Sequence, residues 1–501
     1  MVDVGAAAHE TAGEPGSYSP MQRRCVLIAA ILASSMAFID GSVLSIAIPS
    51  LRADLGASLS EVQWVSNGYL LLLGSMLLLG GAAGDRFGLR RVFGLGIALF
   101  VGASLVCALA PQVSMLIAFR IVQGLGAAMM VPGSLAIIAK AYPRASRGRA
   151  IGLWAAASSL TTIMGPVLGG LVLTALGDWS WRLVFAINLP LGAAALAMLV
   201  LRVPSDRPSS SHGLDLVGAG LASAGLLLVA FGLTGSGGES APPLSQAVIY
   251  CGGGAVLLAG FVWWERRAAH PMLPMRLFAS LPFSGANALT FTLYFALTGV
   301  TFYLPMTMIA GWGASPAQVS LVMLPFGLAI TLISGLSGRW ADRFGPGPLI
   351  TSGAIVVGLA FAGLGITASA QQIWLGVLPL IALAGVGMAL VVSPLSTAVM
   401  TAVDDADTGI ASGVNNAVSR VAGLVAVAAM GMLASMVFER ALGSAAELPV
   451  FFGLPASGLS DGQEAMRQYA TDTAFATIAY CNAGLCLVSA LVAWVTLERK
   501  I

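Results

Sequence analysis

Charged residues are scarce in this sequence of 501 residues, because only 9% are Asp, Glu, Lys or Arg while 57% are hydrophobic. A soluble domain carries about a quarter charged residues, so the composition excludes an ordinary soluble protein. The net charge is only +2, and the basic residues are spread over many short polar breaks, which is unlike a nucleic-acid-binding surface. The sequence therefore predicts a membrane protein that binds no nucleic acid.

Histidine and cysteine are also few. The three histidines, His9, His212 and His270, all fall in polar stretches, and the five cysteines show no metal or redox spacing. An enzyme embedded in the membrane would need a cluster of nucleophile, base or metal ligands. We therefore predict that the protein is not an enzyme and uses neither a metal nor an organic cofactor.

Long apolar runs are what the sequence does contain. A run of about 20 apolar residues can cross the hydrocarbon layer as a helix, and this predicts an all-α integral membrane protein. We count fourteen such runs, near residues 25–49, 62–82, 91–110, 113–139, 149–176, 182–203, 214–234, 246–264, 283–309, 318–338, 348–368, 373–400, 408–436 and 474–496.

Basic residues indicate the orientation, because short loops rich in Arg and Lys stay on the cytoplasmic side. If the N-terminus is cytoplasmic, the outer loops contain only Arg52, Arg182, Arg440 and Arg467, and nearly all other basic residues lie inside. This division requires an even number of spans, so both termini are predicted to be cytoplasmic. The first twenty residues lack the basic start and short apolar core of a signal peptide.

A short loop occurs twice. Asp-Arg-Phe-Gly stands at 85–88 after the second span and at 342–345 after the tenth, and parallel repeats of this kind are common in transporters. The offset of eight spans predicts two six-helix bundles with two extra helices between them. The predicted division is a cytoplasmic tail 1–24, a bundle 25–203, a linker with two extra helices 204–282, and a bundle 283–501 with an external loop near 437–472.

Several motifs accompany the repeat. The first loop contains Gly81, Asp85, Arg86, Gly88 and Arg90; the fourth span reads RIVQGLG from Arg120, with Gln123; and the fifth reads GPVLGG, with Gly165, Pro166, Gly169 and Gly170. At these residues the chain resembles the major facilitator superfamily, specifically its fourteen-span proton-driven drug antiporters, over nearly its whole length. The stretches QWVSNGYLL (63–71) and WRLVFAINLPLG (181–192) are similar to the same family.

The resemblance implies a role for each motif. The repeated loop would be a conformational latch formed by Gly81, Asp85, Arg86, Gly88 and Arg90 together with Asp342, Arg343 and Gly345. GPVLGG would be the antiporter motif. Two positions depart from the family pattern, because Leu89 stands where Arg is usual and Thr161 replaces an earlier Gly of the antiporter motif. The family also implies a monomer in a bacterial cell (inner) membrane.

Asp40 is the acid that lies well inside a predicted span, in FIDGSVLSIAIP. It lies about 24 Å of helix rise beyond Arg24, and the stretch resembles the first-span signature of the antiporters. Burial favours the neutral form of a carboxyl and a nearby cation favours the ionised form, so surroundings that alternate would load and release a proton. We predict proton coupling by Asp40, helped by Arg120 if the two approach; a carboxylate satisfied by nearby Ser hydroxyls is the alternative.

The predicted function is therefore proton-coupled export of lipophilic, monocationic or neutral small molecules, with membrane lipids and protons as the other partners and the proton gradient as the energy source. A lipid or fatty-acid exporter and an uptake symporter remain as alternatives. Candidate residues of the substrate cavity are Gln63, Asn67, Gln123, Trp154, Asn287, Tyr294, Phe295, Tyr303, Met306 and Asn415.

Overall fold

The computed structural model describes residues 18–205, 213–235, 238, 242–404, 407–443, 450–456 and 458–497. Within these residues the chain is helical, and fourteen helical segments are long and apolar enough to cross a membrane. The prediction of an all-α membrane protein with fourteen spans is thus confirmed. Most of the predicted tail 1–24 lies outside the described residues.

The helices follow one another with short connections. They are α1 (Pro20–Leu55), α2 (Leu59–Phe87), α3 (Leu89–Ala108), α4 (Val113–Ala141), α5 (Arg144–Leu176), α6 (Trp181–Ala186), α7 (Asn188–Arg202), α8 (Leu216–Thr234), α9 (Leu244–Glu265), α10 (Leu281–Met306), α11 (Pro316–Phe344), α12 (Pro346–Thr367), α13 (Leu378–Thr401), α14 (Thr408–Leu442) and α15 (Asp461–Leu497). The sixth span combines a 3₁₀ turn at Asp178–Ser180 with α6 and α7.

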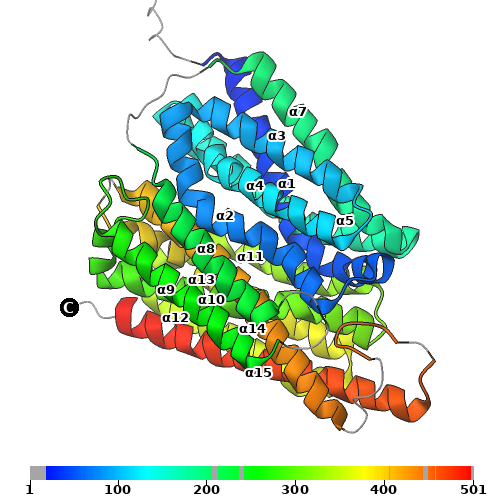
Figure 1. Ribbon diagram of the computed structural model, residues 1–501. Coiled ribbons are helices and arrows are strands. Elements are labelled where there is room, and N and C mark those ends of the chain that lie inside the picture. The colour runs from blue at the N-terminus through cyan, green and yellow to red at the C-terminus, as the bar shows by residue number, and fades with distance from the viewer. Residues whose placement is uncertain are drawn as a thin grey trace, which may run out of the picture.

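Two helix bundles make up most of the molecule (Figure 1). Helices α1–α7 form the N-terminal bundle and α10–α15 the C-terminal bundle, and α8 and α9 form a hairpin between them in sequence. Leu226 and Ala230 of α8 pack against Leu71 of α2 and Leu424 of α14. The hairpin therefore lies along the seam where the two bundles meet.

The repeat seen in the sequence is also present in the structure. Both α2 and α11 begin with a capping box, in which Ser58 pairs with Glu61 and Ser315 with Gln318. Such a box satisfies the first free backbone N–H groups of a helix. The repeated loops then end α2 at Gly88 and α11 at Gly345, with φ of 97° and 83°, which only glycine adopts readily.

We call the side where α1 begins and α15 ends the terminal face, and the other side the opposite face. The bundles come together at the opposite face and diverge towards the terminal face (Figure 1). In the terminal half of α5, the exposed residues Gly152, Leu153, Ala155 and Ala156 cover about half of the helix circumference. Near the opposite face, by contrast, α5 packs against α11: Ser320 Oγ donates a 2.7 Å hydrogen bond to Pro166 O.

The loop between the last two helices is shorter than the predicted 437–472, because α14 continues to Leu442 and α15 begins at Asp461. Charged residues such as Glu439 and Glu464 broke the apolar pattern that we used to place the boundaries. A helix remains stable beyond the hydrocarbon layer, where its charged side chains meet water and interfacial groups. Of this loop, Phe452 is only 2% exposed and packs against Phe438 and Tyr303.

Candidate functional site

Asp40 and Arg120 form an ion pair inside the N-terminal bundle. Arg120 Nη1 lies 2.6 Å from Asp40 Oδ2, and each side chain is 1% exposed. Asp40 comes from the middle of α1 and Arg120 from α4, so the pair joins two helices that are adjacent in the bundle. The carboxylate points neither to lipid nor to water in this conformation.

Gln123 completes the coordination of both charges. It lies one turn after Arg120 on α4, and its Oε1 accepts a 2.7 Å hydrogen bond from Arg120 while its Nε2 donates a 3.1 Å bond to Asp40 Oδ1. Nε2 also donates to Ser104 Oγ on α3, which accepts a second bond from Asn188 Nδ2 on α7. Four helices thus hold the two charges in one buried polar network.

The guanidinium of Arg120 has further partners. Its Nε donates a 2.8 Å hydrogen bond to the carbonyl of Val65 on α2. Its Cζ lies 4.4 Å from the ring centroid of Tyr69 and 5.6 Å from that of Phe185. Aromatic faces attract a cation, so Arg120 stays stabilised if the charge on Asp40 is removed.

The motif GPVLGG holds α5 against two other helices at once. A side chain at Gly165 or Gly169 would contact Val43 of α1, at distances of 3.4 and 2.5 Å from its nearest Val43 atoms, whereas one at Gly170 would collide with Ser320 and Pro316 of α11. Glycine therefore permits a close approach on both sides. The turn of α1 beside this motif, from Ile39 to Val43, is the turn that carries Asp40.

Thr161, which replaces the earlier Gly of the antiporter motif, also contacts α1. Its Oγ1 lies 3.1 Å from Ser35 Oγ, and two turns earlier on α5 Trp154 Nε1 donates a 2.9 Å hydrogen bond to Ser34 Oγ. Here a pair of hydroxyls joins the helices where glycine is usual. The departure therefore adds a polar contact between α1 and α5.

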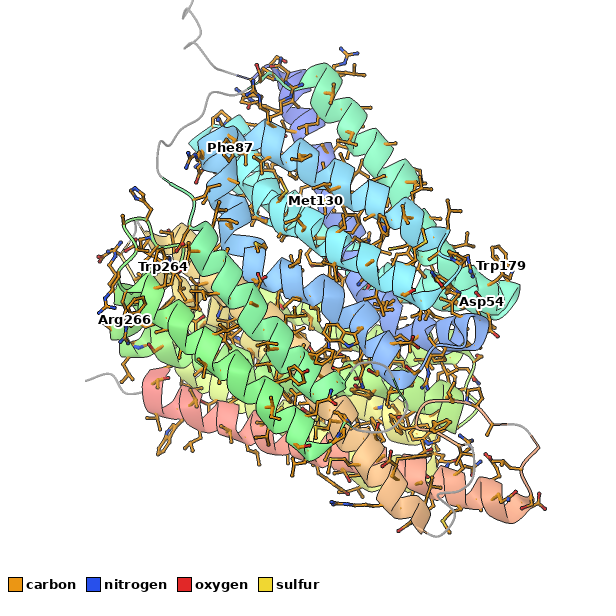
Figure 2. All side chains as sticks on the ribbon, viewed as in Figure 1. Asp54, Phe87, Met130, Trp179, Trp264 and Arg266 are labelled. Carbon is orange, nitrogen blue, oxygen red and sulfur yellow. The ribbon has the colours of Figure 1, made fainter. Side chains whose placement is uncertain are left out.

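The repeated loops lie at the terminal face, and Figure 2 labels Phe87 at the end of α2 there. Arg86 lies over Phe87 at 5.5 Å, and Arg343 lies over Phe344 at 5.2 Å, so the repeat extends to its side chains. Arg90 donates hydrogen bonds of 3.1 and 2.9 Å to the carbonyls of Leu199 and Val200 at the end of α7, where a cation is favourable. The latch itself stays a prediction.

The candidate cavity residues do not form one cluster. Gln63 Nε2 donates to the Tyr303 hydroxyl at 3.0 Å and so joins α2 to α10, while Met306 is buried below the loop at Gly453. In the C-terminal bundle Asn415 Nδ2 donates to Asn287 Oδ1 and Thr290 Oγ1. Gln123 lies in the Asp40 network, and Trp154 is on α5. Tyr294 and Phe295 are on α10. Asn67 is fully buried, and neither of its amide atoms is hydrogen-bonded.

Sequence reasoning did not assign roles to Ser104, Asn188, Tyr69 and Phe185, which surround the ion pair. Three of them lie in the two stretches that resembled the antiporter family, at 63–71 and 181–192. That resemblance was the available signal. Ser104 had none, because a serine in an apolar helix is ordinary.

Comparisons with known proteins agree with this architecture. The family described as Major Facilitator Superfamily matches residues 30–427 and 286–499. The multidrug resistance protein B homolog of Mycobacterium tuberculosis is 34% identical over 372 residues, which are 74% of this chain and 68% of that protein. From Streptomyces coelicolor, a probable actinorhodin transporter is 33% identical over 86% of this chain and 76% of its own length, and the methylenomycin A resistance protein is 32% identical over 79% and 83%.

Solved structures show the same fold at low sequence identity. A bacterial homolog of the human lysosomal transporter Spinster, crystallised in an inward-facing and unoccupied conformation, aligns with a TM-score of 0.67 and 16% identity, over 96% of this chain and 100% of that one. A D-xylose-proton symporter aligns with a TM-score of 0.64 and 17% identity, over 95% and 98%. The family match and the relatives named as transporter and resistance proteins indicate a multi-pass membrane transporter and not an enzyme. The chain belongs to the Major Facilitator Superfamily.

Proposed function

We propose that this chain is a proton-coupled antiporter that exports lipophilic small molecules, neutral or singly cationic, by alternating access. The observation that carries the proposal is the fully buried ion pair between Asp40 and Arg120. Ionisable groups inside transmembrane bundles are costly and most often belong to proton or substrate pathways. Names of the relatives, which include multidrug resistance and antibiotic export proteins, support the substrate class.

In the cycle that we propose, the structure corresponds to a state with the opposite face closed and Asp40 ionised. The carboxylate accepts hydrogen bonds from Arg120 and Gln123, so two donors from α4 hold it in this state. Protonation of Asp40 would remove the attraction to Arg120, while Val65, Gln123 and Tyr69 would keep the guanidinium in place. The proton would enter when the opposite face opens and leave when the terminal face opens.

Coupling between this site and the faces would pass through α1 and α5. The α1 turn that carries Asp40 packs on the α5 glycines, and the same stretch of α5 contacts α11 of the other bundle. A change in the fit of α1 after protonation would therefore alter the contact that closes the opposite face. Two discrete packings of this kind are what allosteric coupling requires.

The charge of the substrate is not set by Asp40 alone. Arg120 already neutralises this carboxylate in the structure, so a cationic substrate would not find an unpaired acid there. Neutral and monocationic amphiphiles both fit a cavity that accepts them by apolar contacts. We further propose that the transporter works as a monomer in a bacterial cell membrane, with the terminal face in the cytoplasm.

The test uses the purified full chain in liposomes with an imposed pH gradient and ethidium as a lipophilic monocation. We expect ethidium and protons to move in opposite directions, and Asp40→Asn to abolish this proton-driven flux while it still elutes as a folded protein. Asp178→Asn, which changes an exposed acid near the opposite face, is the matched control and should transport normally.

Three outcomes would overturn the proposal. Normal flux by Asp40→Asn would remove the proton-coupling role. Flux of ethidium and protons in the same direction would indicate a symporter. Transport of a fluorescent phospholipid without any effect on ethidium would indicate a lipid exporter.

A further inference from the structure

A second pair of buried carboxyls lies far from Asp40, at the terminal-face end of the α8–α9 hairpin. Asp215 directly precedes α8 and is 8% exposed, and Glu265 is the last residue of α9 and is 3% exposed. The two carboxyls are within hydrogen-bonding distance of each other. Figure 2 labels the neighbouring Trp264 and Arg266, which mark this end of the hairpin.

One oxygen of each carboxyl is fully satisfied by the protein. Asp215 Oδ1 accepts 2.8 Å hydrogen bonds from the backbone N–H of Gly218 and from Trp264 Nε1. Glu265 Oε2 accepts a 3.0 Å bond from the backbone N–H of Leu273. These bonds fix both side chains, because breaking them would leave buried N–H groups without an acceptor.

The other two oxygens lack a donor. Asp215 Oδ2 and Glu265 Oε1 are both inaccessible to water and accept no hydrogen bond in the part of the chain that the structure describes. Both face the same point: a methyl group added to Gly218 would lie 2.6 Å from the first and 2.7 Å from the second. Two buried acceptors thus lie beside the same point, and neither has a donor.

A single proton resolves this arrangement. If both carboxyls were ionised, two like charges would be adjacent in a buried place, which is strongly unfavourable. One proton turns one carboxyl into a donor, satisfies both unpaired oxygens with one hydrogen bond, and removes one of the charges. Pairs of carboxyls that share a proton for this reason are well known in proteins.

Other charged groups around the pair do not replace the proton. Arg266 and Arg267 follow Glu265 and are exposed, with Arg267 placed over Trp263 at 4.1 Å, and His270 lies in the next turn. The helices packed on α8 carry Asp85 and Arg86 on α2 and Arg420 on α14. None of these six groups donates a hydrogen bond to either unpaired oxygen.

We propose that Asp215 and Glu265 share one proton and form a second protonatable site of this chain, outside the transport pathway. At the other end the hairpin is held to α2, because Ser60 Oγ donates to Thr234 O and Trp64 Nε1 donates to Gly235 O. The shared proton would hold the terminal-face end together. Loss of the proton in an alkaline cytoplasm would separate the carboxylates and loosen the hairpin along the seam between the bundles.

Infrared spectroscopy of the full chain in lipid tests the proposal, because a protonated carboxyl has a C=O stretch distinct from that of a carboxylate. At neutral pH we expect one such band, lost in both Glu265→Gln and Asp215→Asn. Either amide retains a donor for the facing oxygen, so both variants should fold. Asp40→Asn is the matched control and should keep the band, which also separates this site from the proposed transport role.

A second measurement is the melting temperature between about pH 6 and about pH 9, a range in which unperturbed carboxyls do not titrate. The melting temperature of the wild-type protein should fall as the pH rises and the shared proton leaves. In Glu265→Gln this fall should be at most half as large. The proposal would be overturned if no protonated-carboxyl band appeared at neutral pH and the melting temperature of Glu265→Gln changed with pH as that of the wild type does. Stabilisation by Mg²⁺ or Ca²⁺ that EDTA reverses would also overturn it, because two ionised carboxylates would then hold a metal ion.

Discussion

The Arg52 guanidinium donates a 2.9 Å hydrogen bond to the carbonyl of Phe452, and this bond joins α1 of the N-terminal bundle to the segment that precedes α15. Its Nε donates a second bond, of 3.1 Å, to Ala57 O, and the side chain is 1% exposed. A buried cation satisfied by carbonyls of two bundles closes the opposite face. The loop between α14 and α15 therefore takes part in this closure.

Arg52→Ala should shift the protein towards a state that is open at the opposite face. The carbonyl of Phe452 would lose its donor at a cost of about 1–3 kcal/mol, and because this bond joins the two bundles, the cost falls on the closed state. Spin labels near the opposite-face ends of α5 and α11 should report a larger population of long distances. Arg440→Ala, which removes an exposed cation near the same face, should leave the distances unchanged; equal distributions for both variants would contradict the role of Arg52.

Arg120→Lys should impair transport although it preserves the charge. A lysine ammonium cannot reach Asp40, Gln123 and Val65 O together and also lie flat on Tyr69 as the guanidinium does. We expect a loss of about 1–3 kcal/mol in the free energy of unfolding and slower proton-driven flux, measured by thermal melting and in liposomes. Arg24→Lys at an exposed position of α1 is the control, and wild-type flux in Arg120→Lys would refute the geometric requirement.

Gly170→Ala should weaken the contact between α5 and α11. The added methyl would overlap Ser320 Oγ and the carbonyl of Pro316, so the helices must separate. We expect faster labelling of a cysteine placed at Thr174, measured with a membrane-impermeant maleimide from the opposite face. Gly152→Ala on the same helix has no atom within 4 Å of the new methyl and should label at the parental rate.

A second substitution checks the cause of that effect. Ser320→Ala removes the clash with the hydroxyl but leaves the Cβ of residue 320 at 2.9 Å and the carbonyl of Pro316 at 2.5 Å, so it should restore slow labelling only in part when combined with Gly170→Ala. Full restoration would mean that the backbone contact is unimportant. No effect of Gly170→Ala at all would show that α5 does not depend on this close approach.

Much of the fold could be predicted, because the lengths of the apolar runs and the positions of the charged residues between them can be read from the local sequence. The fourteen spans and the repeated loop needed no knowledge of tertiary contacts. The ends of α14 and α15 were misplaced, since helices continue into water without an apolar pattern. Asp40 and Arg120 were recognisable because each is a charge in an apolar run, but their contact depends on the relative height of α1 and α4, which no local pattern encodes.

The buried neighbours of the pair were harder to identify. Both Ser104 and Asn188 are uncharged; Ser104 accepts two hydrogen bonds from other helices and Asn188 donates one of them, so their importance arises only from their position. The burial of the Asp215–Glu265 pair could not be predicted from the sequence, for a related reason. Both acids stand at span ends, where a charge normally reaches water, and only the packing of α9 against α8 buries them.

Variants at Tyr303 and Asn415 separate residues that stabilise the closed state from residues that could contact substrate. It accepts a bond from Gln63 Nε2 and donates a 2.5 Å bond to Val427 O, so Tyr303→Phe leaves a buried amide on α2 without its partner. We expect an equal fractional loss of flux for ethidium and for a neutral lipophilic dye, because the closed state is destabilised whatever is carried. Asn415→Ala, in contrast, removes the polar atoms of a half-buried side chain that donates to the buried Asn287 and Thr290, and it should change the ratio of the two fluxes. A changed ratio in Tyr303→Phe would instead place that hydroxyl in contact with substrate.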